Sequence, residues 1–168
     1  YASLLEGMDK SVGDLLALLD ELGVADNTLV VFTSDNGGVS HAYRSMAPPH
    51  THNTPLSSGK GSHHEGGIRV PLLVRWPGVT KAASVNETSV IIYDWFPTLL
   101  KAAGAPLPPS EIDGLDLAPL LRGRNDPAFD RPLVWHFPTF WGGLDHPGPR
   151  EGPGLGPSST LHRGDWKL

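Results

Sequence analysis

VVFTSDNGGVSHAYRSMAPPHTHNTPLSSGKGSHHEGGIRVPLLVRW, residues 30–76, is the stretch that decides how this chain folds. Thr28 to Thr33 is a β-branched, apolar run that predicts a buried strand. Val70 to Trp76 predicts a second strand, closed by Pro77-Gly78. The segment between them, Ser34 to Ser58, is too polar and too rich in Pro, Ser and His for a core element. A loop of this length in a compact domain is usually functional or disordered.

Helices are predicted on either side of this stretch. Apolar side chains recur at helical spacing over residues 2–22, and Gly23 supplies a stop. Asp94 is expected to cap a second helix that runs to Ala103. A short helix is expected around residues 117–121. Helix, turn and apolar strand in succession indicate an α/β fold.

The C-terminal part of the sequence predicts strands and a long irregular segment. Leu133 to Phe137 predicts a strand, and the Gly/Pro-rich segment from Thr139 to Ser159 predicts a surface excursion. Thr160 to Leu168 is expected to form a pair of strands that turns at Arg163-Gly164-Asp165. The sequence has no internal repeat.

Composition narrows the classes of function. A chain of 168 residues buries one sizeable core, and a net charge of −5 argues against a nucleic-acid partner. No apolar stretch approaches the roughly 20 residues of a membrane span. The absence of cysteine excludes disulfides, a thiolate nucleophile and a cysteine zinc site. Because the chain starts at Tyr1 without an initiator methionine, we expect it to be a piece of a longer protein.

Asp35 and Asn36 directly follow the first predicted strand. Ligands of open α/β sheets bind at the carboxyl ends of strands, where these two residues are expected. A carboxylate beside an amide oxygen offers hard donors that suit Ca²⁺ or Mg²⁺. The alternative is an ordinary turn, since Asp-Asn-Gly-Gly contains four residues that favour turns.

Lys60 lies between two glycines in Ser58-Gly59-Lys60-Gly61-Ser62. Its ammonium group suits an anionic oxygen, and the glycines permit close approach of a ligand. The segment is not a phosphate-binding P-loop, because Thr54 and Gly61 occupy positions where that motif has Gly and Ser/Thr. The alternative is a solvated loop lysine.

Other polar motifs carry less information. His50, His52 and the pair His63-His64 raise the question of zinc, but they lie on predicted loops without a ligand spacing typical of such sites. Glu65 to Arg69 predicts a tight glycine turn with a local ion pair, although Arg69 reaching into the site is the alternative. Asn86-Glu87-Thr88 matches a glycosylation sequon that occurs often by chance.

Five segments in order resemble the sulfatase family, in its arylsulfatase-like branch of the alkaline-phosphatase superfamily. They are MDKSVGDLLALLDELGVADNTLVVFTSDNGG, PLSSGKGSHHEGGIRVPLLVRWPG, DWFPTLLKAAGAP, DGLDLAPLLRG and GDWKL. The resemblance implies part of an α/β sandwich whose site lies at the carboxyl edge of a large mixed sheet flanked by helices. It implies that residues 1–125 are the C-terminal part of the catalytic domain. Residues 126–168 would then be a Gly/Pro-rich segment and the start of a C-terminal subdomain.

The resemblance also implies roles for individual residues. Asp35 and Asn36 match a pair of calcium ligands, with magnesium as the alternative metal. Lys60 matches a lysine that contacts the sulfate group and assists catalysis. His63-His64 depart from the family pattern, which commonly has an aromatic residue just before Glu-Gly-Gly, and this departure would alter the wall of the pocket.

The family nucleophile is formylglycine, made from the first residue of Cys/Ser-x-Pro-x-Arg, and this chain contains no such motif. We therefore expect a sulfuric ester hydrolase whose reacting residue precedes Tyr1, and no turnover by residues 1–168 alone. The substrate would be a glycan or aryl sulfate ester. A phosphodiesterase or phosphonate monoester hydrolase of the same superfamily is one alternative, and a non-catalytic fragment is another. The resemblance also implies a periplasmic or secreted protein.

Overall fold

The structure is a computed structural model that describes residues 1–39, 51–138 and 157–168. The chain divides into two compact units, Tyr1–Pro77 with Phe137–Ser158, and Gly78–His136 with Ser159–Leu168. Both units combine helices with strands, and each has an antiparallel pair of strands. The predicted α/β class is therefore confirmed.

The first unit begins with the helix α1, Ala2–Glu21, which confirms the prediction made from apolar spacing. Gly23 follows it with a φ of +67°, a left-handed conformation that favours glycine at the end of a helix. No residue of α1 is buried, and Leu4 is 74% exposed. The described parts of the chain thus leave the apolar stripe of α1 uncovered. They contain no helix with the length and apolar character required to cross a bilayer.

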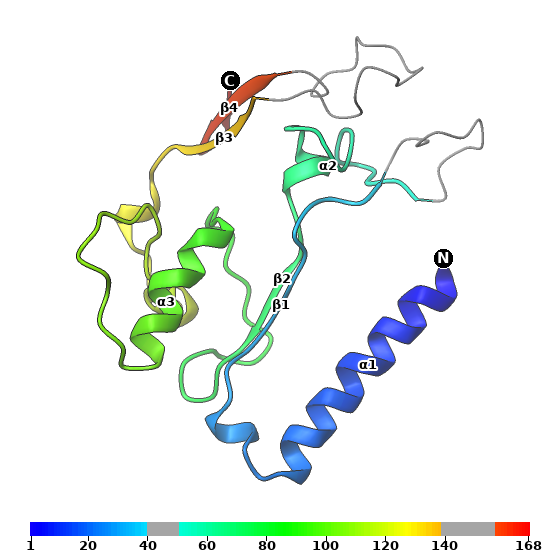
Figure 1. Cartoon of the computed structure of the whole chain (residues 1–168), viewed down its shortest axis with the longest axis vertical. Coiled ribbons are helices and arrows are strands. Elements are labelled where there is room, and N and C mark those ends of the chain that lie inside the picture. The colour runs from blue at the N-terminus through cyan, green and yellow to red at the C-terminus, as the bar shows by residue number, and fades with distance from the viewer. Residues whose placement is uncertain (40–50, 139–156) are drawn as a thin grey trace. The chain divides into compact units, whose positions relative to one another are not determined.

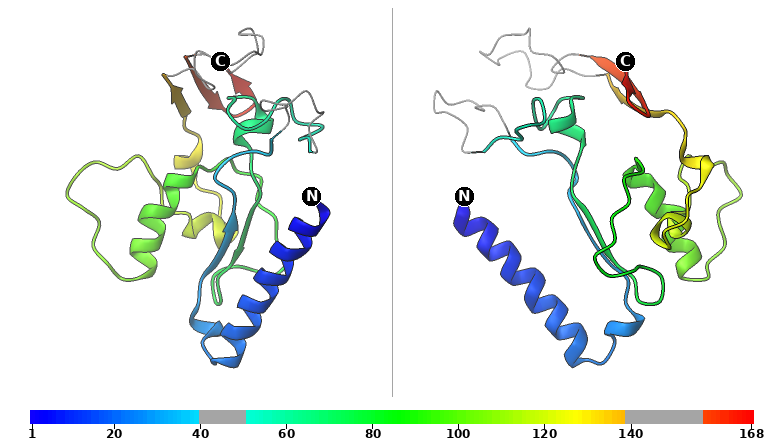
Figure 2. Two further views of the ribbon diagram at one scale, coloured as in Figure 1. Left: turned by 45° about the vertical axis from the view of Figure 1, so that its right-hand side comes forward. Right: turned by 180° about the vertical axis from the view of Figure 1, so that it is seen from behind.

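The first unit also contains a two-stranded antiparallel sheet of β1, Val30–Thr33, and β2, Leu72–Arg75. The two ribbons run side by side in every view (Figures 1 and 2). Both predicted strands exist, within slightly longer predicted ranges. The expectation that the first would be buried is wrong for the described structure, because all four residues of β1 are half-buried. Among the described elements, only β2 packs extensively against it.

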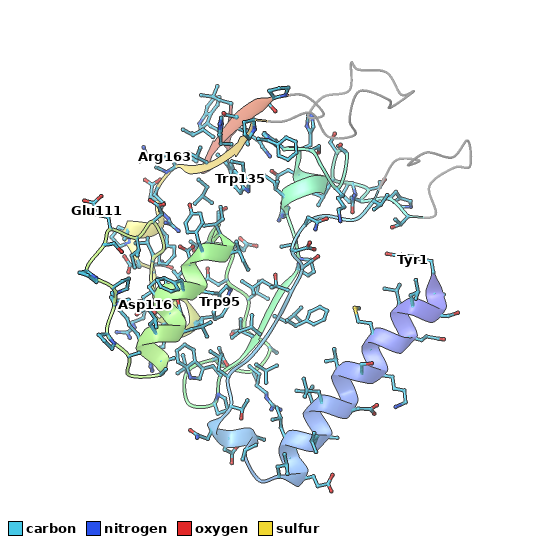
Figure 3. The ribbon with its side chains drawn as sticks, in the orientation of Figure 1. Tyr1, Trp95, Glu111, Asp116, Trp135 and Arg163 are labelled. Carbon is cyan, nitrogen blue, oxygen red and sulfur yellow. The ribbon has the colours of Figure 1, made fainter. Side chains whose placement is uncertain are left out.

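The second unit contains the hydrophobic core of the described chain. Its helices are the 3-10 turn η2, Ile92–Asp94, then α3, Trp95–Ala102, α4, Ala118–Leu121, and the 3-10 turn η3, Pro127–Phe129. Figure 3 labels Trp95 at the start of α3. The buried hydrophobic side chains are Trp95, Leu117, Leu120, Phe129 and Leu133. Both predicted helices in this unit are confirmed.

Asp94 is fully buried in the second unit, with 0% of its surface exposed. It occupies the N-cap position of α3, but its side chain does not bond to the helix, so the predicted cap interaction is wrong. The carboxylate instead accepts hydrogen bonds from the backbone N–H of Ile91 at 3.0 Å and of Leu115 at 2.8 Å, and forms an ion pair with Arg131. Together these three partners satisfy the buried charge more completely than one N–H group of the helix could.

A three-stranded sheet lies at the C-terminal end, in the order β3, Leu133–Phe137, β4, Ser158–Arg163, and β5, Trp166–Lys167. The strand prediction at 133–137 and the predicted pair of strands are confirmed. Gly164 makes the turn between β4 and β5 with a φ of +55°. Most of the predicted excursion, residues 139–156, lies outside the described residues.

Candidate functional site

The antiparallel pairing of β1 and β2 brings the predicted site residues to one end of the sheet. Thr33, the last residue of β1, lies opposite Leu72, the first residue of β2. The segment that carries Asp35 and Asn36 therefore leaves the sheet where the segment that carries Lys60 returns. The resemblance implied a large mixed sheet at this site. In the described structure the local sheet is antiparallel, and one long loop connects its two strands.

A seam of backbone hydrogen bonds joins the two segments. The N–H of Gly37 donates to the carbonyl of Gly67 at 2.8 Å. The N–H of Lys60 donates to the carbonyl of Gly38 at 3.0 Å. A third bond, from Gly66 N–H to Ser57 O at 2.8 Å, lies within the second segment and fixes the backbone there. Lys60 is thereby tied to the same loop that carries Asp35 and Asn36.

The seam requires glycine because the two backbones touch. A Cβ on Gly37 would lie 1.7 Å from the carbonyl oxygen of Gly66, and one on Gly67 would lie 2.1 Å from the carbonyl oxygen of Ser62. Neither contact is compatible with a side chain at these positions. The two Gly-Gly pairs in the sequence, at 37–38 and 66–67, are the signal from which this close approach of backbones could have been found.

Besides the glycines, the site contains Asn53, which the sequence analysis did not identify. Its side-chain N–H₂ donates to the carbonyl of Gly38 at 2.8 Å and to the carbonyl of Ser58 at 3.0 Å. One amide thus bridges the loop after β1 and the loop before β2. Nothing in the local sequence distinguishes this asparagine from an ordinary loop residue.

The side chains of Asp35, Asn36 and Lys60 are available for a ligand. Asp35 is exposed, whereas Asn36 and Lys60 are half-buried. Within the parts of the chain that the structure describes, none of these three side chains makes a hydrogen bond or an ion pair. The turn that carries Asp35 and Asn36 is held by Ser34, whose hydroxyl donates to the carbonyl of Asn36 at 2.8 Å. Two oxygen donors and one cation are therefore displayed on a loop cluster whose backbone is fixed.

Asp35 and Asn36 fit a hard cation in chemistry but supply only part of a coordination shell. Ca²⁺ takes about six to eight oxygen ligands, so most would come from elsewhere. The described residues contain no group of three or more His, Cys, Asp and Glu side chains placed to hold a metal ion. Of the histidines, His50 lies outside the described residues, and His63 forms a ring contact with Phe137 instead.

The segment before β2 is α2, Glu65–Ile68, a single turn of helix. The sequence predicted a tight glycine turn here, which is wrong because Arg69 N–H bonds to Glu65 O at 2.8 Å, the spacing of an α-helix. Glu65 and Arg69 also form the expected local ion pair, with 4.0 Å between the charged atoms. Arg69 is 70% exposed along its side chain, so it contributes little to stability through this pair.

A comparison with protein families identifies the class of protein that has this fold and these loops. The sulfatase family model matches residues 1–105, and the chain belongs to the sulfatase family.

Individual relatives agree with this assignment. A sulfatase of Formosa agariphila is 40% identical over 153 residues, covering 83% of this chain and 26% of the relative. Human steryl-sulfatase is 42% identical over 139 residues, covering 82% of this chain and 24% of the relative. The chain therefore spans about a quarter of the length of these curated relatives.

Solved structures share the fold. Ps i-CgsB in complex with k-i-k-neocarrahexaose has a TM-score of 0.78 at 30% identity, covering 99% of this chain and 33% of that chain. The phosphonate monoester hydrolase SpPMH from Silicibacter pomeroyi has a TM-score of 0.65 at 26% identity, covering 92% of this chain and 28% of that chain.

Proposed function

We propose that the whole protein containing this chain hydrolyses sulfate esters, and that this chain supplies groups that hold the sulfate. The observation that carries the proposal is the hydrogen bond from Lys60 N–H to Gly38 O at 3.0 Å. This bond joins the backbone of Lys60 to the segment that carries Asp35 and Asn36, which supports a shared site. Membership of the sulfatase family supports the reaction type.

Asp35 and Asn36 would hold a divalent cation through a carboxylate and an amide oxygen. Calcium suits this donor set, and magnesium is the alternative. When bound, the cation supplies Lewis acidity at a sulfate oxygen. Because Asp35 is exposed in the described structure, its carboxylate reaches a ligand at no cost in broken contacts.

Lys60 would bind an oxygen of the sulfate group. Its ammonium group offers three N–H donors and a full positive charge, which counters the negative charge of the sulfate and of the departing oxygen. The seam anchors the lysine at its own backbone N–H, so the side chain starts from a fixed point. A fixed cation stabilises the transition state more than a mobile one, because no reorganisation is needed during the reaction.

The nucleophile is proposed to come from another part of the protein. This chain has no cysteine, and none of its serines begins a Ser-x-Pro-x-Arg motif. Residues 1–168 alone are therefore expected to release no sulfate from 4-nitrophenyl sulfate. Sulfate release by this chain alone that is lost in Lys60→Ala would contradict this assignment.

We further propose a sulfated glycan as the substrate. The support is the likeness to Ps i-CgsB, whose solved complex contains the oligosaccharide k-i-k-neocarrahexaose. A loop cluster that displays a carboxylate, an amide and an ammonium group also suits a ligand rich in hydroxyl groups better than an apolar alcohol.

The test is sulfate release by the full-length protein, with Lys60→Ala as the variant. Loss of a charge-stabilising group of this kind lowers kcat by about 10²–10³. Lys81→Ala is the matched control, because Lys81 is an exposed lysine of the second unit. Equal turnover by Lys60→Ala and wild type would remove the proposed role of the lysine.

Hydrolysis of phosphonate monoesters is the second candidate function, favoured by the likeness to SpPMH. A divalent cation and a lysine suit a phosphoryl group as well as a sulfuryl group. The two are separated by kcat/KM for 4-nitrophenyl sulfate and for 4-nitrophenyl phenylphosphonate. A larger value for the phosphonate would replace the first proposal with the second.

A further inference from the structure

The backbone of Lys60 needs support from other parts of the chain, because the lysine lies between two glycines. Gly59 and Gly61 have no side chain that restricts the main chain, and Gly61 adopts a φ of +89°. Ser58, two residues before the lysine, has a φ of +63°, a left-handed conformation that costs free energy in residues other than glycine. A lysine on such a segment keeps one position only if other contacts hold the segment.

The side-chain amide of Asn53 supplies these contacts. Its Nδ2 donates to the carbonyl of Ser58 at 3.0 Å and to the carbonyl of Gly38 at 2.8 Å, so both of its N–H groups are used. The N–H of Lys60 donates to the same Gly38 carbonyl at 3.0 Å, which occupies both lone pairs of that oxygen. Asn53 thus holds the chain two residues before Lys60 and also holds the acceptor of the lysine's own N–H.

Asn53 is itself held in place. The N–H of Leu56 donates to the backbone carbonyl of Asn53 at 2.8 Å and closes a turn after it. A Cβ on Gly38 would lie 2.7 Å from the amide oxygen of Asn53, so the amide packs directly against the glycine. The half-buried asparagine therefore has both a fixed backbone and a fixed amide.

We propose that Asn53 is a positioning residue, which fixes the backbone of Lys60 so that the lysine stabilises the transition state. This inference rests on the proposed function. Asn53 acts through the lysine and takes no part in bond cleavage. A displaced cation counters the developing charge less well, and a misplacement of about 1 Å costs up to about 10²-fold in rate. Loss of the amide should therefore lower kcat much more than it raises KM.

The test measures sulfate release by the full-length protein from 4-nitrophenyl sulfate and from a panel of sulfated monosaccharides. Variants are compared on the substrate that wild type hydrolyses fastest. Asn53→Ala and Asn53→Leu both remove the two donors, and leucine nearly keeps the shape of asparagine, which separates lost hydrogen bonds from a cavity. Both variants should lower kcat about ten- to hundredfold and raise KM less than about threefold. The leucine variant alone serves if the alanine variant does not fold.

The matched control is Asn27→Ala, because Asn27 is an exposed asparagine of the same unit. It should keep the wild-type kcat and KM.

Two combined variants show whether Asn53 acts through the lysine. In a Lys60→Ala background, the further change Asn53→Ala should lower kcat by less than about threefold, because the cation that Asn53 positions is already absent. A general loosening of the fold would instead make the two losses multiply. Adding Ser58→Gly to Asn53→Ala should raise kcat at least about threefold, because glycine adopts the φ of +63° without strain.

Three outcomes would refute the positioning role. They are a wild-type kcat in Asn53→Leu, losses that multiply in the double variant with Lys60→Ala, and no recovery on adding Ser58→Gly. The proposed function survives each of them, provided that Lys60→Ala alone has lost turnover. Wild-type turnover in Lys60→Ala would remove the proposed role of the lysine and the positioning role with it. A wild-type protein that releases sulfate from none of the substrates would refute the proposed function itself.

Discussion

Gly37→Ala tests whether the backbone seam holds the candidate site together. A methyl group at this position would lie 1.7 Å from the carbonyl oxygen of Gly66 and 2.9 Å from the Cα of Gly67. Both atoms belong to backbone, so neither can rotate away. To reach van der Waals separation the two loops must move apart by about 1–2 Å. The hydrogen bond from Gly37 N–H to Gly67 O, now 2.8 Å, would be lost.

The cost can be estimated from these two effects. An overpacked methyl group costs about 1–3 kcal/mol, and a lost backbone hydrogen bond costs about 0.5–1.5 kcal/mol. Local opening of the seam would therefore become easier by about 2–4 kcal/mol. Since each 1.4 kcal/mol is a factor of ten, amide exchange that proceeds through this opening would accelerate by about 30- to 1000-fold.

Hydrogen exchange of the full-length protein, followed by mass spectrometry of peptides, measures this directly. The peptides that cover residues 34–39 and 57–67 should lose protection in Gly37→Ala. Sulfate release should fall by about 10²-fold, because a displacement of about 1 Å between Lys60 and the loop of Asp35 spoils the geometry of binding.

Gly13→Ala is the matched control, because a Cβ at Gly13 in α1 would meet nothing within 4 Å. It should stabilise α1 by up to about 1 kcal/mol and leave exchange in residues 57–67 unchanged. If Gly37→Ala exchanged the amides of that segment as slowly as wild type and released sulfate as fast, the argument that the seam couples the two loops would be refuted.

Three further predictions concern the rest of the chain. Asp94→Asn should destabilise the second unit by about 3–5 kcal/mol, because Arg131 loses the fully buried charge with which it pairs, and faster proteolysis of that unit would show it. Asp35→Ala should weaken calcium binding by the full-length protein at least tenfold in calorimetry, and an unchanged affinity would exclude Asp35 as a ligand. The hydrogen bond from Arg163 lowers the pKa of Asp130 below 3.8. The stability that Asp130 contributes to the folded state is therefore fully present above pH 3.8 and is lost as the pH falls through the lowered pKa. The difference in denaturation midpoint between wild type and Asp130→Asn should therefore vanish in acid, and a difference that persists there would contradict this account.

The secondary structure was predictable where the signal is local. The helix over residues 2–21 follows from apolar spacing, and Gly164 marks the turn of the C-terminal strands. The pairing direction of β1 and β2 was not predictable, because an apolar run has the same appearance in a parallel and in an antiparallel sheet. Asp94 shows the same limit, since its partners Leu115 and Arg131 lie 21 and 37 residues further along the chain.

The candidate site was predictable in its polar residues and not in its framework. Asp35, Asn36 and Lys60 stand out because acid, amide and lysine flank a long polar loop. The contacts that bring them to one loop cluster are made by glycine backbones and by Asn53, which carry no chemical signature of a ligand site. The metal and sulfate roles of the three residues stay predictions, and the variants described above test them.

The glycine seam has a consequence for how such a site changes during evolution. The junction between the two loops is made by main-chain atoms together with the amide of Asn53, so a side chain that makes no contact across the junction does not hold the loops together. Exchanges of such side chains can therefore alter which molecules are accepted without loosening the framework. A designer who wishes to redirect this protein should randomise side chains outside the junction and leave Asn53 and the four glycines, 37, 38, 66 and 67, untouched.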